Sequence, residues 1–383
     1  MADVLFVTWD GGGNVPPALG LAAELQHRGH TVRFLGHAQQ RPTIEGAGFG
    51  FDPYTRARPW SSTEPSSGPS AAFKFITMFT DNGPGVDLLE NLAHHPAEFL
   101  VIDCMSLGAL RAAERAGLRR AVLVHTYYRF LTHSWSRGPV GLAARLKGQP
   151  PEQLWTKADV LLVAADRALD PARDKDLPAS LHHVGVVQSR PLHFDSAPDA
   201  PDAPGAPPEH VAGDAAPAVL VSLSTTYFPG QDQSLQSILD ALAGLPVRGI
   251  VTTGAAVDPG QLRAPANVEV HRYRDHGDVM PAVDLVIGHG GHATTMRALS
   301  HDLPLLVMPM HPMLDQKMIG QSVERQGAAK LLRKTASAEQ IRDTVRQLLE
   351  PGPHRHAAAL IGARLRKNSG AVAAADRLST LLA

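Results

Sequence analysis

The sequence predicts an α/β protein built from two doubly wound domains, each with a parallel sheet covered by helices. Short apolar runs rich in β-branched residues alternate with amphipathic stretches over residues 4–187, a pattern typical of strand–helix–strand units with parallel pairing. The same alternation restarts at residue 218. The intervening residues 189–217 are rich in Pro, Ala, Asp and Gly, a composition that favours an extended linker over a packed core. We therefore expect a first domain over residues 1–188, a linker over 189–217 and a second domain over 218–383.

The first domain is expected to open with a strand over residues 4–9, then a glycine-rich turn and a helix with leucines on one side. Further strands are predicted over residues 31–35, 99–103, 120–125, 160–164 and 183–187, with a helix over 107–116. Residues 55–72 are rich in Ser and Pro and have no hydrophobic period, which indicates a long surface loop.

The second domain repeats the alternation. Its strands are predicted over residues 218–223, 249–253, 268–271, 285–289 and 305–309, and its helices over 235–243 and 294–300. Residues 354–382 follow a helical pattern, and the sequence leaves open which of the two domains this last helix packs on.

Composition excludes several classes of protein. Of the 383 residues, 44% are hydrophobic, which is enough for two large cores. Lys and Arg number 36 against 37 Asp and Glu, so no net positive field would attract nucleic acid. Cys104 is the single cysteine, and it cannot form an intrachain disulfide. We expect a cytoplasmic protein without a membrane span, because no signal peptide precedes the first strand and no apolar run reaches ~18 residues.

The motif LVIGHGGHATTMRAL has the strongest chemical signal. A buried strand ends at His289, two glycines allow close backbone approach, and Thr294 and Thr295 lie in the first turn of a helix. The unpaired amides and the positive dipole end of such a turn suit a diphosphate. The alternative is an ordinary glycine turn followed by threonine caps.

The longer segment HGGHATTMRALSHDLPLLVMPMHPMLDQ resembles the donor-binding signature of the family 1 nucleotide-sugar glycosyltransferases, especially the bacterial natural-product enzymes. The layout of the whole chain is similar to their GT-B fold, with two facing Rossmann-like domains and an active site in the cleft. The resemblance places Asp315 and Gln316 at the sugar hydroxyls, where a solvated loop pair is the alternative. It places His289 and Thr294 at the diphosphate, and the other donor-binding candidates in this loop are Gly291, His292 and Ala293.

Two further segments resemble the nucleoside and phosphate contacts of that family. In VEVHRYRDHGDVMP, the resemblance implies that Tyr273 stacks on the base and that His276 lies near the ribose, whereas strand-end packing is the alternative for Tyr273. In SLSTTYF, it implies that Thr225 approaches the phosphate, with a polar strand end as the alternative. The chain departs from the family at Ile319, where Asn is usual.

The amino-terminal loop WDGGGNVPPALG also resembles the family but carries an unusual residue. The position that usually holds a His or Asp base is Asn14, whose amide cannot accept a proton near pH 7. Asp10 is the nearest carboxylate, and its alternative role is to bind loop amides. Asp103 lies where the family places a carboxylate that orients the base. The catalytic candidates are therefore Asp10, Asn14 and Asp103, and the acceptor-binding candidates are Trp9, Gly13, Trp60, Phe79 and His125.

These residues predict an inverting transfer of a (deoxy)sugar from a TDP- or UDP-sugar to a small hydrophobic acceptor such as a polyketide aglycone. No cofactor or metal is expected, because the histidines are scattered and the D-x-D at Asp174 and Asp176 lies away from any strand end. A rival hypothesis is a non-catalytic nucleotide-sugar-binding partner of another glycosyltransferase, supported by Asn14. A dehydrogenase is disfavoured because GGGNVPP lacks the third glycine of a dinucleotide loop. The oligomeric state is left open, a homodimer included.

Overall fold

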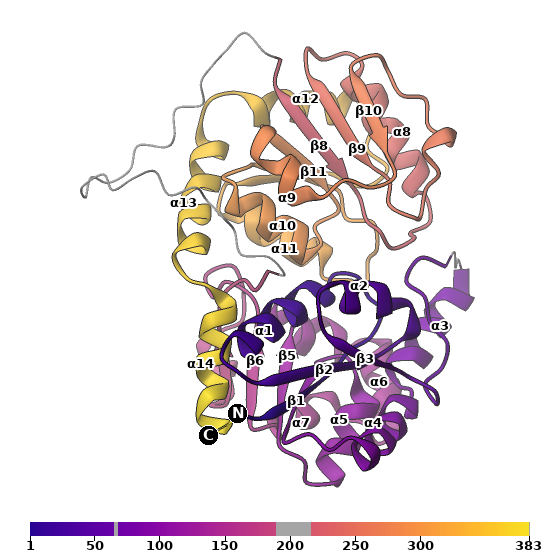
Figure 1. Cartoon of the computed structure of the whole chain (residues 1–383). Coiled ribbons are helices and arrows are strands. Elements are labelled where there is room, and N and C mark those ends of the chain that lie inside the picture. Colours follow the sequence, from indigo (N-terminus) through magenta and orange to yellow (C-terminus); the bar gives the residue numbers. More distant parts are fainter. Residues whose placement is uncertain (65–67, 189–215, 383) are drawn as a thin grey trace, which may run out of the picture. The chain divides into compact units, whose positions relative to one another are not determined.

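A computed structural model describes residues 1–64, 68–188 and 216–382, without the side chains of 68–72. The chain divides into two compact units (Figure 1). Unit 1 comprises Met1–Ser189, His311–Ile319 and Asn368–Ala383, and unit 2 comprises Arg190–Met310 and Gly320–Lys367. The sequence places one division between domains, whereas the contacts group two late segments with unit 1. Nearly all of the predicted linker lies outside the described residues.

Unit 1 is built on a seven-stranded parallel sheet in the order β3-β2-β1-β4-β5-β6-β7. The strands are β1 (Asp3–Val7), β2 (Thr31–Gly36), β3 (Gly50–Pro53), β4 (Phe99–Asp103), β5 (Arg120–Val124), β6 (Val160–Val163) and β7 (Leu181–His183). The direction of winding reverses between β1 and β4. In sheets of this type, ligands bind beyond the carboxyl ends of the strands at such a reversal.

Helices cover both faces of this sheet. They are α1 (Val15–His27), α2 (Arg41–Gly46), α3 (Gly68–Phe79), α4 (Gly83–His94), α5 (Leu107–Arg115), α6 (Pro139–Leu146), α7 (Pro151–Thr156) and α14 (Gly370–Leu382), with a π-helical turn, η2 (Phe130–Trp135). Prolines in the first turn of α1 fit a helix start, because no intrahelical partner awaits their missing amide hydrogens. Gly20 of α1 meets the chain so closely that a Cβ atom would lie 2.2 Å from the Gln188 carbonyl oxygen.

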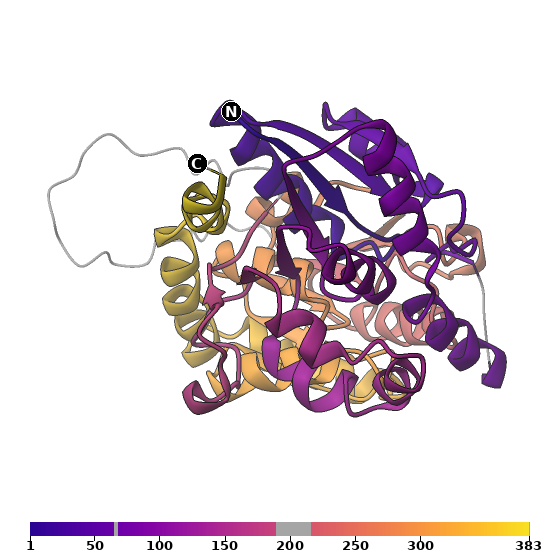
Figure 2. The ribbon, with the colours of Figure 1, turned by 90° about the horizontal axis from the view of Figure 1, so that it is seen from below.

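The C-terminal helix α14 belongs to the core of unit 1. Ala374, Ala375 and Leu378 are fully buried in the cluster that also contains Leu25 of α1 and Phe6 of β1. On the surface, Arg28 of α1 forms an ion pair with Asp376 at 2.7 Å. Figures 1 and 2 show the end of α14 (yellow) beside the start of β1. The last element of the chain therefore completes the first domain.

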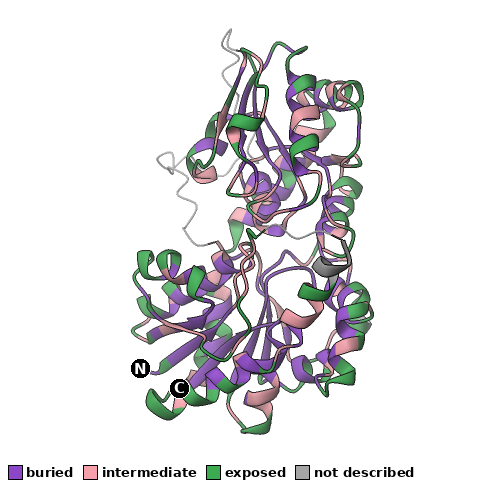
Figure 3. Ribbon diagram, turned by 90° about the vertical axis from the view of Figure 1, so that its right-hand side faces the viewer, coloured by how far each residue is buried: buried purple, intermediate pink, exposed green. Residues whose placement is uncertain are grey.

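Unit 2 contains a six-stranded parallel sheet in the order β10-β9-β8-β11-β12-β13. The strands are β8 (Ala218–Ser222), β9 (Arg248–Thr252), β10 (Val268–His271), β11 (Leu285–Gly288), β12 (Leu305–Val307) and β13 (Ala329–Leu331). The helices are α8 (Gln231–Leu242), α9 (His276–Val279), α10 (His292–Ser300), α11 (Gln316–Arg325), which continues from unit 1, α12 (Ala338–Leu349) and α13 (Pro353–Lys367). The strands of both sheets are largely buried (Figure 3). Here the winding reverses between β8 and β11.

The predicted α/β class with two parallel sheets is confirmed, with local differences. The expected loop over residues 55–72 gives way to helix α3 from Gly68, and the strand expected at 183–187 lies at Leu181–His183. The single C-terminal helix is two helices, α13 and α14. Short elements such as β3 and β13 escaped prediction because a few residues carry too little periodicity. Among the described residues, no helix is long and apolar enough to cross a bilayer.

The position of α14 predicts a stability difference between two leucines. Leu378 is fully buried in unit 1, whereas Leu360 of α13 is 59% exposed. We expect Leu378→Ala to lower the free energy of unfolding by about 2–5 kcal/mol, since it leaves a cavity, and Leu360→Ala to change it by less than about 0.5 kcal/mol. Urea denaturation followed by far-UV circular dichroism, which reports on the helices of both units, would measure both. Equal effects would contradict the assignment of α14 to the core.

Candidate functional site

At the reversal point of unit 1, a buried carboxylate collects four hydrogen bonds. Asp103, the last residue of β4, is 4% exposed. Its Oδ1 accepts from the Trp9 indole nitrogen at 3.0 Å and from the Met105 amide at 2.9 Å. Its Oδ2 accepts from Asn14 Nδ2 at 3.3 Å and faces His125 Nδ1 at 2.9 Å. All the lone pairs of the carboxylate are therefore engaged, which offsets the cost of its burial.

Asn14 is buried at 2% exposure beside this carboxylate, just before α1. Its Nδ2 lies within hydrogen-bond distance of three acceptors, namely Thr8 Oγ1, the Trp9 carbonyl oxygen and Asp103 Oδ2. Rotating the amide by 180° would place its oxygen against these oxygens, so the orientation is well determined. Its Oδ1 is buried without a hydrogen-bond partner. An amide held in this way cannot take up a proton but can accept a hydrogen bond from a bound hydroxyl.

His125 follows β5 and lies on the other side of Asp103. Burial lowers the pKa of the imidazole, but Asp103 and Cys104 raise it by more than burial lowers it. The net pKa therefore lies well above the usual 6.5. The Cys104 sulfur is 3.7 Å from Nδ1, and burial raises the pKa of this thiol. Atoms of Asp103, Cys104 and His125 lie within 4.8 Å of one another, a spacing that could suit a metal. The hydrogen bonds already made by the carboxylate argue for a polar cluster instead.

Asp10 has a different environment from the one expected for a base. Its Oδ2 accepts a hydrogen bond from the Ser62 amide at 2.9 Å, and its carbonyl oxygen accepts one from the Trp60 indole at 2.7 Å. Its own amide donates to His37 Nδ1 at 3.2 Å. The alternative role, binding of loop amides, therefore describes the contacts of Asp10 in the structure.

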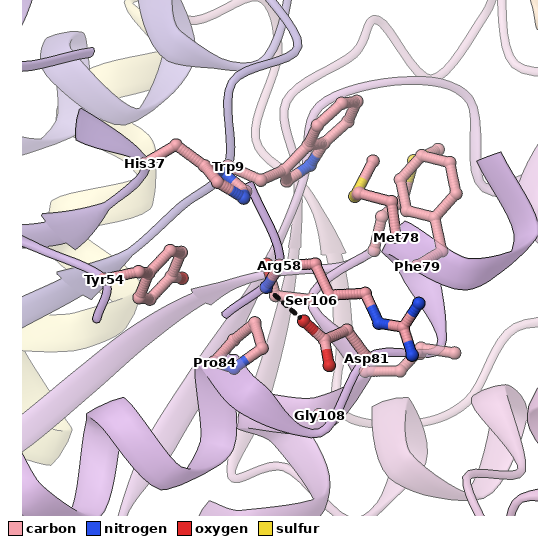
Figure 4. A pocket seen from close by; sticks show the side chains of 12 residues that line it. Trp9, His37, Tyr54, Arg58, Met78, Phe79, Asp81, Pro84, Ser106 and Gly108 are labelled. Atoms are coloured by element: carbon pink, nitrogen blue, oxygen red, sulfur yellow. Dashed lines mark hydrogen bonds between the residues drawn. The ribbon is translucent and has the colours of Figure 1, made fainter. Parts of the chain in front are cut away.

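Trp9 and Met105, two of the donors to Asp103, also line an aromatic pocket (Figure 4). Trp9 and Phe79 form its apolar wall, with ring centroids 5.0 Å apart in an edge-to-face arrangement. Arg58 and Asp81 supply polar lining, and the Arg58 amide donates to Asp81 at 2.7 Å. Other lining residues are His37, Tyr54, Met78, Pro84, Met105, Ser106, Leu107 and Gly108.

Further aromatic rings extend this wall. Phe75 contacts both Phe79 and Trp60, with centroid distances of 5.5 and 5.4 Å. Of the predicted acceptor residues, Trp9, Trp60, Phe79 and His125 thus belong to one connected set of rings, since His125 lies 6.4 Å from Trp9. Gly13 is exposed, and an added Cβ atom would contact nothing.

At the reversal point of unit 2, the predicted phosphate loop connects β11 to α10. Gly290 has φ +85°, which favours glycine, and an added Cβ at Gly291 would lie 2.4 Å from His289 Nε2. The two glycines therefore let the loop close tightly around the His289 ring. Burial lowers the pKa of His289 to about 4, an effect that the Ser222 carbonyl partly opposes. Its Nδ1 is buried without a hydrogen-bond partner.

Helix α10 begins immediately after this loop. His292, Ala293 and Thr294 are its first three residues, with Gly291 as N-cap, so their amides have no intrahelical acceptor. His292 is buried, while Ala293 and Thr294 are half-buried. The four residues make the helix start accessible to an anion.

The predicted phosphate residue Thr225 and the predicted nucleoside residues Tyr273 and His276 follow other strands of unit 2. Thr225 follows β8 and is exposed. Tyr273 follows β10 and is 74% exposed, so packing at the strand end does not account for its ring. His276 begins α9, its Nε2 lies 3.1 Å from Thr252 Oγ1, and burial lowers its pKa.

Asp315 and Gln316 belong to the late segment that groups with unit 1. Thr126 Oγ1 donates to Asp315 Oδ2 at 2.5 Å. Burial raises the pKa of Asp315, while Thr126 and His125 act in the opposite direction. Gln316 is buried and accepts from the His311 amide at 3.0 Å. Both residues are therefore held by specific contacts, unlike a solvated loop pair.

The sequence did not predict several of these contacts. Thr126 as the partner of Asp315, and the lining formed by Arg58, Asp81 and Met105, carry no motif. Their common signal is position: Met105 and Thr126 follow the ends of β4 and β5, which meet at one edge of a parallel sheet.

Comparison with known proteins shows which proteins the chain resembles. Residues 236–372 match the model of the erythromycin biosynthesis protein CIII-like C-terminal domain. The chain is 27% identical to 4'-demethylrebeccamycin synthase of Lentzea aerocolonigenes, over 94% of each chain. Over 26% of the chain and 22% of the relative, it is 36% identical to demethyllactenocin mycarosyltransferase of Streptomyces fradiae. The chain is thus similar to glycosyltransferases of natural-product biosynthesis.

Solved structures support the GT-B fold. The kitacinnamycin glycosyltransferase superposes with a TM-score of 0.79 at 22% identity, covering 100% of this chain and 99% of that one. A calicheamicin glycosyltransferase gives 0.77 at 21% identity, covering 100% and 98%. At these identities the likeness concerns the fold alone.

The lowered pKa of His289 predicts a pH effect on stability. Unfolded His289 takes up a proton near pH 6.5, whereas the folded residue does so only near pH 4. Protonation therefore favours the unfolded chain as the pH falls from about 6.5 to about 4, and stability falls in that window. We expect His289→Gln to reduce this loss, and His356→Gln, at an exposed site of α13, to leave it unchanged. Denaturation midpoints at pH 7.5 and 5 would measure this loss of stability. An equal change of midpoint between the two pH values in wild type and His289→Gln would contradict the buried environment of His289.

Proposed function

We propose that the protein catalyses inverting transfer of a (deoxy)hexosyl group from a TDP- or UDP-sugar to a small hydrophobic acceptor. The observation that carries this proposal is the loop at the reversal point of unit 2, where His289 and the start of α10 converge. Amides without intrahelical acceptors and the positive end of a helix dipole form a site for a diphosphate. The unpartnered Nδ1 of His289 adds a polar atom to that site.

The same groups account for the chemistry of the leaving group. In an inverting reaction the acceptor attacks the anomeric carbon from the face opposite the diphosphate, and negative charge grows on the departing phosphate oxygen. Fixed dipoles aimed at that oxygen stabilise the transition state without reorganisation. We assign this task to the first turn of α10 and to His289, so the proposed mechanism uses no metal or other cofactor.

The remaining predicted donor residues take complementary roles in this proposal. Tyr273 is exposed and available to stack on the base, and His276 contacts Thr252 at the carboxyl end of the neighbouring strand β9. Thr225 approaches the phosphates, and Asp315 with Gln316 holds the sugar hydroxyls. A relative crystallised with thymidine diphosphate, a spinosyn rhamnosyltransferase, has the same fold at a TM-score of 0.72, which is consistent with a thymidine nucleotide.

The acceptor is assigned to the aromatic pocket of unit 1. Its wall of Trp9 and Phe79, extended by Phe75 and Trp60, favours a flat apolar molecule that stacks on rings. Arg58 and Asp81 at the same pocket offer hydrogen bonds to polar substituents. A polyketide or another aromatic aglycone combines both features.

The rival hypothesis, a nucleotide-sugar-binding partner without catalysis, rests on Asn14. The contacts of Asn14 agree with the loss of a base at that position, because its amide is fixed by three acceptors. The two hypotheses differ in one measurable outcome. Both predict nucleotide binding, but only the glycosyltransferase transfers sugar to an acceptor.

A thermal-shift panel with TDP, UDP and GDP tests the donor site, since a ligand that binds only the folded state raises the melting temperature. We expect TDP or UDP to stabilise the wild type and His289→Ala to bind the same nucleotide about tenfold or more weakly, the loss expected for a hydrogen bond to a charged group. The control is His356→Ala, at an exposed site of the same unit. Unchanged affinity in a folded His289→Ala variant would remove His289 from the site, and nucleotide binding without transfer to a broad acceptor panel would favour the rival.

A further inference from the structure

We propose that His125, positioned by Asp103, removes the proton from the acceptor in place of the residue at position 14. This inference rests on the proposed function, since it concerns the transfer reaction. It explains how a glycosyltransferase works with an amide where its relatives usually have a base. Four observations within unit 1 support this role of His125.

The first contact is shared. Asp103 Oδ2 accepts from Asn14 Nδ2 at 3.3 Å and faces His125 Nδ1 at 2.9 Å. The carboxylate that would orient a base at position 14 therefore orients an imidazole from the end of β5. Asn14 keeps the carboxylate in place, and His125 supplies the ring that Asn14 lacks.

The second point is the tautomer of His125. Because Nδ1 donates to the carboxylate, the neutral ring carries its lone pair on Nε2. Among the described residues, none forms a hydrogen bond with Nε2, and 11% of the side chain surface remains exposed. The same arrangement of carboxylate, imidazole and hydroxyl activates nucleophiles on unrelated folds.

The third point is the distance to the acceptor pocket. Trp9 and Met105 both line that pocket, and both donate a hydrogen bond to Asp103. The His125 ring lies 6.4 Å from the Trp9 ring, centroid to centroid. His125 does not itself line the pocket, so the proposal requires that an acceptor stacked on Trp9 direct its hydroxyl past the Trp9 ring to Nε2.

The fourth point is the sugar side. Thr126, the next residue along the chain, donates to Asp315 at 2.5 Å, and the family resemblance assigns Asp315 to the sugar hydroxyls. Consecutive residues after β5 therefore face the acceptor and the residue that holds the sugar. Asp10 offers no comparable link, since its carboxylate accepts from the Ser62 amide.

In the proposed step, His125 Nε2 takes the proton of the acceptor hydroxyl while the hydroxyl oxygen bonds to the anomeric carbon. The bond between that carbon and the phosphate oxygen breaks, and its electron pair leaves with the nucleoside diphosphate. His125 becomes an imidazolium stabilised by Asp103 and later releases the proton to water. Asp103 is a positioning residue here, because it acts through His125.

The charges around His125 determine the pH dependence. Asp103 and Cys104 face the ring, Asp315 lies on the neighbouring segment, and Asn14 and Trp9 are neutral. The pKa of His125 is raised by Asp103, and only the neutral ring acts as a base. Turnover should therefore rise as the pH increases through this raised pKa and level off above it.

The test compares turnover and its pH profile in the full-length protein and three variants. His125→Asn retains a donor at the place of Nδ1 but lacks Nε2, and Asp103→Asn removes the carboxylate. His133→Gln, at an exposed position of η2, is the control. We expect His125→Asn to lower kcat by a factor of about 10² to 10⁴ and to abolish the rise of kcat with pH (the rising limb of the pH profile). The TDP-induced thermal shift should be unchanged. We expect Asp103→Asn to lower kcat and to move the limb to lower pH, and the control to behave as wild type.

A merely structural His125 gives a different pattern. If His125→Asn folds, binds TDP and retains both kcat and the rising limb, or if Asp10→Asn takes the loss instead, the inference is overturned while the proposed function stands. If His125→Asn lowers kcat at every pH by the same factor, so that the rise of kcat with pH keeps its midpoint and its relative size, the imidazole is not the base. If the wild type transfers no sugar to any acceptor, the proposed function and the inference fall together.

Discussion

The buried carboxylate of Asp103 is the interaction on which the arrangement of unit 1 depends. Its four donors come from the loop after β1, the residue before α1, the turn after β4 and the end of β5. A carboxylate without water is costly unless such donors replace the water. Burial of one charge therefore fixes the loops that carry Trp9, Asn14 and His125, and with them one wall of the aromatic pocket.

Two histidines at the two reversal points show opposite electrostatics. Beside Asp103, His125 has a raised pKa, whereas His289, packed against Gly291 with no carboxylate among the causes of its shift, has a pKa lowered to about 4. Burial acts on both rings in the same direction, so the neighbouring charge decides the outcome. In the proposed mechanism the two rings have different tasks, proton transfer for His125 and contact with a phosphate for His289.

Much of the fold could be predicted from apolar periodicity. The strand at Val268–His271 was predicted with its observed bounds, and β2, β4 and β8 to within one residue at either end. The prediction was wrong where periodicity competes with composition: the Ser- and Pro-rich stretch before Phe73 concealed the start of α3. The helical pattern of residues 354–382 was correct, but it could not reveal that α13 and α14 belong to different units, because both helices carry an apolar face and only the available core selects between them.

The sequence by itself determined the two parallel sheets and the glycine loop after β11, since each depends on local residue types and spacing. That Asn14 stands where a base is usual was implied by the family resemblance. Tertiary structure decided which side chains contact the Asp103 carboxylate. Asp103, His125 and Asn14 come from three separate segments and meet only because parallel strands end at the same edge of the sheet. Asp10 lies four residues before the predicted base position, yet its carboxylate binds a loop amide. Hydrogen bonding acts over about 3 Å in space, and that distance bears no relation to separation along the chain.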